Sequence, residues 1–197
     1  MLKMHDKRGL ITRIFLEWWN KHKRDFPWRY TKDPYSILIA EMLLRKTTAK
    51  QVEKIYDEFL AKYPNPKSIA EADKNELKEM LKPLGMEHKR AELFKKLGTS
   101  VEEKHNGQIP LELEELLKLP GVGMYAANAV LSFACSKDVP LLDTNFIRVI
   151  QRVFGIKSEK SRARDDRKLW EFAKTLIPSG SSKNFNLAVL DLSLIHI

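Results

Sequence analysis

The stretch LEELLKLPGVGMYAANAVLSF, residues 113–133, restricts the possible folds of this chain more than any other. Apolar residues at helical spacing lie on both sides of the turn at residues 120–123. Pro120 ends the first helix, because a proline disfavours the helical conformation in the residue before it. Gly121 and Gly123 allow backbone conformations and close approaches that other residues resist. The stretch therefore predicts a helical hairpin.

The predicted turn leaves backbone N–H groups free at the start of the second helix. Together with the helix dipole, these groups suit an anion such as a DNA phosphate. Gly121, Val122 and Gly123 are therefore candidate DNA-binding residues. The alternative is a tight turn between two packed helices, since the small residues Ala126 and Ala127 permit close helix packing in either case.

The rest of the chain also reads as helical. Apolar residues recur at helical spacing, and no stretch shows the sustained alternation that is typical of strands. The apolar run after Pro34 predicts a buried helix that continues to about Lys46. We expect an all-α fold of two helical lobes flanking a DNA-binding cleft. One lobe spans about residues 30–134 and contains the hairpin, and the other consists of residues 1–29 plus 135–197.

The formal net charge is +9, from 35 lysine and arginine residues against 26 aspartate and glutamate residues. This excess favours a polyanionic partner, above all nucleic acid. No apolar run approaches the roughly 18–20 residues of a membrane span, and the N-terminus has no signal-peptide core. We therefore expect no membrane partner and a cytoplasmic, nucleoid-associated protein. The single cysteine, Cys135, excludes an internal disulfide and a multi-cysteine metal site within this sequence.

Five segments of the sequence resemble one protein family. FPWR and ILIAEMLLRKTTA, residues 26–29 and 37–49, are similar to the opening helices of the adenine glycosylase branch of the endonuclease III superfamily. LPGVGMYAANAV resembles that superfamily's helix-hairpin-helix, PLLDTNFIRVIQRVFG its segment with the catalytic aspartate, and NFNLAVLDLS its last core helix. The resemblance extends from about Trp18 to Leu192 and implies a DNA glycosylase core. Its partner would be double-stranded DNA with a mismatched or deaminated base, and we expect a monomer.

Asp143 corresponds by resemblance to the catalytic aspartate. Breaking an N-glycosidic bond requires a base that is flipped out of the stack, and the sugar gains oxocarbenium character as the bond breaks. A carboxylate near C1′ can stabilise that charge or activate water. The alternative role of Asp143 is a plain helix N-cap, which aspartate often fills. The two roles are compatible, because a cap fixes the rotamer of the carboxylate.

Glu41 is the second candidate acid and lies inside the apolar segment ILIAEMLL. A buried carboxylate must be paired or have a raised pKa, and in either state it can serve a flipped base as acceptor or proton donor. The alternative is a buried salt bridge, for which Arg29 is a candidate partner. By resemblance to the adenine glycosylase branch, Glu41 faces the base pocket.

Tyr125, just after the GVG turn, distinguishes between branches of the family. Bifunctional members have a lysine here that forms a Schiff base at C1′, and adenine glycosylases typically have serine. Tyrosine at this position resembles the pattern of the archaeal thymine/uracil mismatch glycosylases. The residues at two further positions, Ala49 and Leu187, also resemble the pattern of that branch. A phenol is a poor Schiff-base group, so we expect little or no AP lyase activity, whereas its ring can stack on a flipped pyrimidine. The alternative is a core tyrosine.

The segment RKTTAK follows the helix of Glu41, where by resemblance the family inserts a side chain into the base stack. Arg45 or Lys46 is the expected wedge, and the other residue would contact phosphate. The alternative is a pair of surface charges that interact favourably with the end of the helix. Arg148, in the predicted helix after Asp143, is a further candidate for contact with backbone phosphate or with Glu41.

The sequence departs from the family pattern at its C-terminal end. The family usually continues after the DL pair into four cysteines that hold a 4Fe-4S cluster, whereas this sequence ends SLIHI. We therefore expect no cofactor within this chain and a missing iron–sulfur segment, through truncation or because the protein lacks the cluster. No metal site is predicted, because the histidines show no ligand spacing.

These residues predict a monofunctional DNA glycosylase that excises thymine, and uracil, opposite guanine in base excision repair. The product would be an abasic site. The first alternative is an adenine glycosylase acting on adenine opposite 8-oxoguanine or guanine, which shares Glu41 and Asp143 but conflicts with Tyr125 and Leu187. The second alternative is a non-catalytic helix-hairpin-helix DNA-binding module.

Overall fold

The computed structural model describes the backbone of residues 4–195 and the side chains of residues 8–192. His196 and Ile197, the end of the atypical LIHI tail, lie outside the described residues. Helices are the regular elements throughout residues 4–195, with no strand among them, which confirms the all-α prediction. No helix in this range is long and apolar enough to cross a membrane.

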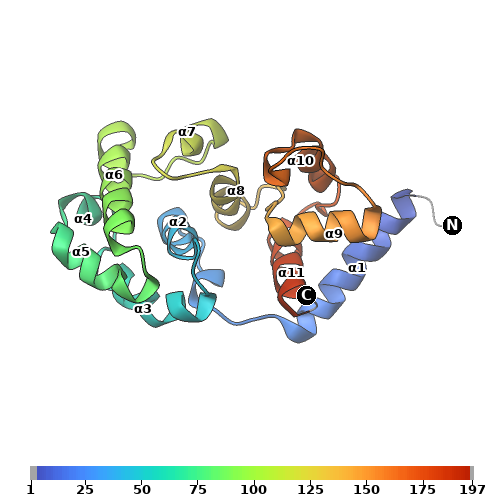
Figure 1. Ribbon diagram of the computed structural model, residues 1–197, viewed down its shortest axis with the longest axis horizontal. Coiled ribbons are helices and arrows are strands. Elements are labelled where there is room, and N and C mark those ends of the chain that lie inside the picture. The colour runs from blue at the N-terminus through green and yellow to red at the C-terminus, as the bar shows by residue number, and fades with distance from the viewer. Residues whose placement is uncertain (1–3, 196–197) are drawn as a thin grey trace. The chain divides into compact units, whose positions relative to one another are not determined.

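The chain forms two compact units (Figure 1). The central unit is Phe26–Cys135, and the terminal unit joins Met1–Asp25 to Ser136–Ile197. In the central unit, α4 and α5 pack on α6, α2 packs on α8, and α7 contacts α8. Its elements are η1 (Pro27–Arg29), α2 (Pro34–Leu43), α3 (Ala49–Lys62), α4 (Pro66–Glu71), α5 (Lys74–Leu81), η2 (Lys82–Leu84), α6 (Glu87–His105), α7 (Leu113–Lys118) and α8 (Met124–Phe133).

Helix α2 is almost wholly buried, as the apolar run after Pro34 predicts. Asp33 caps its start by accepting hydrogen bonds from the backbone of Tyr35 and Ser36. The predicted continuation to about Lys46 is wrong, because α2 ends at Leu43. Lys46 has a left-handed backbone with φ of 55°, which breaks the helical run. The chain then re-enters a helix at α3, where Thr48 and Gln51 form a capping box.

Helices α4 and α6 approach each other unusually closely at Gly98. A Cβ atom on Gly98 would lie 2.7 Å from the carbonyl oxygen of Pro66 and 2.8 Å from the backbone nitrogen of Ala70. Both contacts are shorter than real Cβ atoms show, and both involve backbone. The missing side chain of Gly98 therefore sets the distance between these two helices.

The terminal unit has a core of aromatic side chains. Phe185 of α11 stacks on Phe15 of α1 at 6.2 Å and meets Phe146 of α9 edge-on at 6.0 Å. These contacts join three helices, in agreement with the packing of α1 and α9 on α11. The elements of this unit are α1 (Met4–His22), α9 (Thr144–Phe154), η3 (Ala163–Asp165), α10 (Arg167–Lys174) and α11 (Ser182–Ile195).

Candidate active site

The predicted hairpin is present between α7 and α8. Gly121 has a left-handed φ of 77°, which favours glycine at this position. Val122 is buried and donates a backbone hydrogen bond of 3.0 Å to the carbonyl of Leu119, which closes the turn. Gly123 is the N-cap of α8 and provides no side-chain cap. The first N–H groups of α8 therefore donate no hydrogen bond to an N-cap side chain.

The two glycines of the hairpin differ in the space around them and in their backbone conformation. A Cβ on Gly121 would crowd the side chains of Leu93 and Met42, at 2.8 Å and 3.0 Å. A Cβ on Gly123 would meet no heavy atom within 4 Å, and Gly123 has an ordinary φ of −105°. The described fold thus requires glycine at Gly121 but not at Gly123, where the backbone is open to a ligand.

Helices α2 and α8 hold two of the predicted site residues in the central unit. Glu41 lies on α2 and is only 8% exposed, and Tyr125 lies in the first turn of α8 and is half-buried. Because α2 packs on α8, the central unit places the helices of Glu41 and Tyr125 against each other.

The turn at residues 44–47, between α2 and α3, carries the predicted wedge residues. Arg45 and Lys46 are both exposed, but they differ in their contacts. The guanidinium of Arg45 donates a 2.9 Å hydrogen bond to the carbonyl of Gly121 and so ties the turn to the hairpin. Lys46 stands in the left-handed conformation at the tip. Ala49, half-buried, is the first residue of α3.

Asp143 is the N-cap of α9, as its sequence context predicts. One carboxylate oxygen accepts from the backbone N–H of Phe146 at 2.7 Å, and the other accepts from the Asn145 amide at 2.7 Å. Burial raises the pKa of Asp143 above its ordinary value, although these hydrogen bonds act in the opposite direction. The fold thus fixes the rotamer of this carboxylate and at the same time makes its ionisation less favourable.

The segment that leads into Asp143 is fixed by Asn186, which sequence reasoning missed. The Asn186 side chain is 1% exposed, accepts from the Leu141 N–H at 3.0 Å and donates to the Val139 carbonyl at 2.9 Å. The Asp143 N–H in turn donates to the Leu141 carbonyl at 3.0 Å. Leu187, the residue after Asn186 on α11, is 5% exposed. The signal in the sequence was a polar residue inside the apolar pattern of the last helix.

Arg148 is half-buried in α9 and belongs to the terminal unit, as do Asp143 and Leu187. The remaining predicted site residues belong to the central unit. Within each unit the predicted residues lie on packed helices or in the turns that border them: α2, α3 and α8 in one unit, α9 and α11 in the other.

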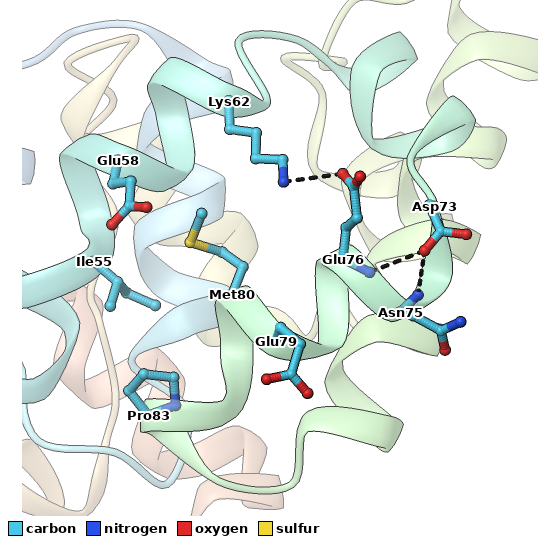
Figure 2. Close-up of a pocket in the computed structure, with 9 residues that line it drawn as sticks. All are labelled: Ile55, Glu58, Lys62, Asp73, Asn75, Glu76, Glu79, Met80 and Pro83. Carbon is cyan, nitrogen blue, oxygen red and sulfur yellow. Dashed lines mark hydrogen bonds and ion pairs between the residues drawn. The ribbon is translucent and has the colours of Figure 1, made fainter.

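A groove between α3 and α5 is a separate feature of the central unit (Figure 2). Its volume is about 610 Å³, and Figure 2 shows an ion pair between Lys62 and Glu76, 2.9 Å apart, on its wall. The other charged residues that line it are acidic, namely Glu58, Asp73 and Glu79. A lining of this sign repels phosphate, so the groove does not suit DNA.

Comparison with known proteins identifies the family. The family model described as "HhH-GPD superfamily base excision DNA repair protein" matches residues 39–175, which include the α2 turn, the hairpin and Asp143. The chain belongs to the HhH-GPD superfamily of base excision DNA repair proteins.

Three HhH-GPD relatives are informative. The chain is 51% identical to a thymine/uracil-DNA glycosylase of Pyrobaculum aerophilum over 90% of this chain and 79% of that protein. It is similar to the solved structure of a thermostable thymine-DNA glycosylase, with a TM-score of 0.92 and 42% identity over 97% of this chain and 88% of the other. It is also similar to endonuclease III in a non-covalent DNA complex, with a TM-score of 0.78 and 25% identity over 96% and 86% of the two chains.

The residues of this HhH-GPD chain do not fit a 4Fe-4S cluster. Such a cluster needs four thiolate ligands, and the sequence has a single cysteine, the half-buried Cys135 just after α8. In the part of the chain that the structure describes, no group of three or more histidine, cysteine, aspartate or glutamate residues could hold a metal ion. No step of the proposed chemistry is assigned to a metal or cluster.

Proposed function

We propose that this protein is a monofunctional DNA glycosylase that removes thymine and uracil opposite guanine, leaving an abasic site. The observation that carries the proposal is 51% identity, over 90% of this chain, to a protein named thymine/uracil-DNA glycosylase. The tyrosine at position 125 agrees with it, because it stands where a lyase would need a lysine nucleophile. We further propose that it acts as a monomer on chromosomal DNA.

Asp143 is the proposed catalytic residue. Its hydrogen bonds with Phe146 and Asn145 hold the carboxylate in one rotamer, so that it can stand beside C1′ of the flipped nucleotide. The ionised carboxylate stabilises positive charge on the sugar or activates the attacking water. Because burial raises its pKa, base release should accelerate with pH until this carboxyl is fully ionised.

Glu41, Tyr125, Ala49 and Leu187 are proposed to shape the base pocket. The buried carboxyl of Glu41 offers hydrogen bonds to the edge of the base, and the ring of Tyr125 offers a surface for stacking. Leu187 offers an apolar contact for the methyl group of thymine. Tyr125 has no amine to form a Schiff base, so AP lyase activity should be little or absent.

The hairpin and the turn between α2 and α3 are proposed to bind and open the duplex. The open backbone at Gly123 and the start of α8 accept a phosphate. Arg45 already donates to Gly121, so Lys46, exposed at the tip of its turn, is the proposed wedge, and Arg45 braces the turn. Arg148 is proposed to contact backbone phosphate.

Two other functions make different predictions. An adenine glycosylase would share Glu41 and Asp143, but Tyr125 and Leu187 do not match its pattern. A non-catalytic DNA-binding module would bind DNA with steep salt dependence and release no base. Its affinity for DNA would also be insensitive to the loss of the Asp143 carboxylate.

A panel of labelled duplexes tests the proposed function. Duplexes with G·T, G·U, A·U and 8-oxoguanine·A pairs are incubated with the protein and divided into alkali-treated and untreated halves. We expect alkali-dependent cleavage at thymine or uracil opposite guanine, because an abasic site breaks rapidly in alkali and only slowly without it. Cleavage confined to adenine would favour the adenine glycosylase. Breaks without alkali would reveal a lyase nucleophile, and intact strands throughout would favour the binding module.

The two hairpin glycines provide a matched pair for the DNA contact. We expect Gly123→Ser to lower the affinity for duplex DNA about tenfold, the scale of one lost charged hydrogen bond, because the new hydroxyl occupies the phosphate position. Its stability should hold or rise by a few tenths of a kcal/mol, since serine is a better N-cap than glycine. Gly121→Ser should instead cost about 1–2 kcal/mol of stability, because its φ of 77° is left-handed.

Fluorescence anisotropy with an undamaged duplex and thermal melting measure the two effects. The contrast between the variants is the informative result, since both place the same side chain in one turn. Wild-type affinity in Gly123→Ser would rule out a phosphate contact at this residue.

A further inference from the structure

Arg90 is a buried cation that the proposed mechanism does not use. It lies in the first turn of α6, and its side chain is 7% exposed. Burial lowers the pKa of its guanidinium, and the nearby charge of Arg45 acts in the same direction. Arginine is rarely buried unless its donors are satisfied, so its position calls for a structural reason.

The guanidinium of Arg90 is directed at the turn between α2 and α3. All of its hydrogen bonds go to backbone carbonyls or to a hydroxyl, and in the described part of the chain it forms no ion pair. The acceptors are the carbonyls of Gly85 (2.8 Å), Met42 (3.2 Å), Leu43 (3.3 Å) and Arg45 (2.6 Å), and the hydroxyl of Thr47 (2.5 Å).

These hydrogen bonds have two structural consequences for the turn. The carbonyls of Met42 and Leu43 belong to the last turn of α2, where no helical N–H is available, and Arg90 satisfies them. Its bonds to Arg45 and Thr47 flank Lys46 on both sides along the chain. Lys46 is thereby held in a left-handed conformation that costs a non-glycine residue free energy.

The turn is also fastened to two neighbouring elements. Through its Nε atom, Arg90 joins the turn to Gly85, the residue that follows η2. Through the bond from Arg45 to Gly121, the same turn is joined to the hairpin. The proposed wedge thus stands on a turn that is anchored on both sides within the central unit.

We propose that Arg90 is a positioning residue that presets the turn at residues 44–47 for opening the duplex. The inference rests on the proposed function, because it assumes that Lys46 enters the base stack. A wedge that is ordered before DNA binds loses little conformational entropy on insertion, so more of the binding free energy remains to unstack the base. Arg90 itself is buried and acts through the turn.

Only arginine meets the geometric demand at this position. Five N–H donors in a planar fork reach acceptors on two elements at once, whereas the ammonium of lysine has three donors at one point. Arg90→Lys therefore keeps the charge but should lose several of the bonds to the turn. Thr47→Val is a milder variant, because it removes one acceptor and leaves the guanidinium in place.

Lys95 offers a matched control in the same helix. Its ammonium donates to the carbonyls of Ala70 and Ala72, at 2.6 Å and 2.7 Å, and so satisfies the end of α4 as Arg90 satisfies the end of α2. Lys95→Met removes a comparable anchor without touching the turn at residues 44–47. It reports the effect of lost stability alone.

The test compares two substrates under single-turnover conditions. One substrate is a duplex in which the target thymine is paired with guanine. The other contains the same strand with the target thymine unpaired, so no base pair has to be opened. We expect Arg90→Lys to lower the paired-to-unpaired rate ratio about tenfold, the size of coupling within one hydrogen-bonded network, and Thr47→Val to lower it less. Lys95→Met should leave the ratio unchanged. Melting temperatures are measured for all variants.

Each outcome decides the proposal. An unchanged ratio in a folded Arg90→Lys variant, whether or not both rates fall, would overturn it. If Arg90→Lys does not fold, the ratio for Thr47→Val decides in the same way. If the wild type binds DNA without excising thymine, fluorescence of 2-aminopurine beside the mismatch replaces the rate. Failure of the wild type to open the duplex would overturn the function and the role of Arg90 together, whereas normal opening by both variants would overturn only the latter.

Discussion

Replacing Asp143 with asparagine should lower the rate of base release by at least about 100-fold, the loss that follows removal of one preorganised electrostatic group from an active site. The fold should persist, because asparagine is as good an N-cap as aspartate. Its side-chain oxygen can still accept from the Phe146 N–H, which the carboxylate binds at 2.7 Å. The variant therefore separates the capping role from the catalytic role.

The difference in stability between this variant and the wild type should depend on pH in a defined direction. The pKa of Asp143 is higher in the folded protein than in the unfolded chain, because burial outweighs its hydrogen bonds. The folded state then holds its proton over a pH range in which the unfolded chain has released it, so wild-type stability falls as pH rises through that range. Asparagine does not titrate. The melting temperature of Asp143→Asn should therefore equal or exceed that of the wild type at neutral pH, and the difference should shrink in acid.

Asp73→Asn is the matched control for Asp143→Asn. Asp73 also caps a helix, accepting from Asn75 and Glu76 at 2.8 Å and 3.0 Å, but these bonds lower its pKa. Its replacement should leave base release unchanged and give no gain of stability at neutral pH. Melting curves across pH and single-turnover excision from a G·T duplex measure both variants. Wild-type excision by Asp143→Asn would remove the assigned catalytic residue.

Gly98→Ala should destabilise the protein by about 2 kcal/mol or more, a large cost for one added methyl group. The new methyl group would stand 2.7 Å from the Pro66 carbonyl and 2.8 Å from the Ala70 nitrogen, both of which are backbone atoms that cannot rotate away. Alanine is the better helix former by about 1 kcal/mol. The expected destabilisation is the net cost of the clash after this gain in helix propensity. Helices α4 and α6 would have to separate.

The same substitution at Gly9, Gly9→Ala, should stabilise the protein instead of destabilising it. Gly9 lies in α1, is exposed, and a Cβ there would meet no heavy atom within 4 Å. Alanine should stabilise this helix by about 0.5–1 kcal/mol. For a chain of this size, Gly98→Ala should lower the melting temperature by roughly 4–8 °C. A melting temperature at or above that of the wild type would show that α4 and α6 can adjust at no cost.

The features that could be predicted from the sequence are those with local causes. Pro120 and the glycines around Val122 specify the hairpin within a few residues, and Asp143 caps the start of α9, in agreement with the N-cap role that its residue type suggests. The end of α2 could not be predicted in this way. It depends on Arg90, whose guanidinium reaches carbonyls 47 and 48 residues earlier in the chain.

The sequence nevertheless contained a trace of that contact. Arg90 lies on the same helix face as Phe94, Leu97 and Val101, all of which are buried. A cation on an apolar face must find acceptors from another element, but periodicity alone does not say which one. Asn186 is a second case, since its partners are the backbone atoms of a segment more than forty residues away.

The acidic groove between α3 and α5 bears on how the molecule meets DNA. The net charge of +9 attracts the protein to any stretch of duplex, but the carboxylates of Glu58, Asp73 and Glu79 are repelled by the same field. Repulsion at the groove opposes any approach in which its lining meets the duplex, so we expect few encounters to begin there. Added salt screens attraction and repulsion alike, so it should lower the number of encounters and also weaken this bias between orientations.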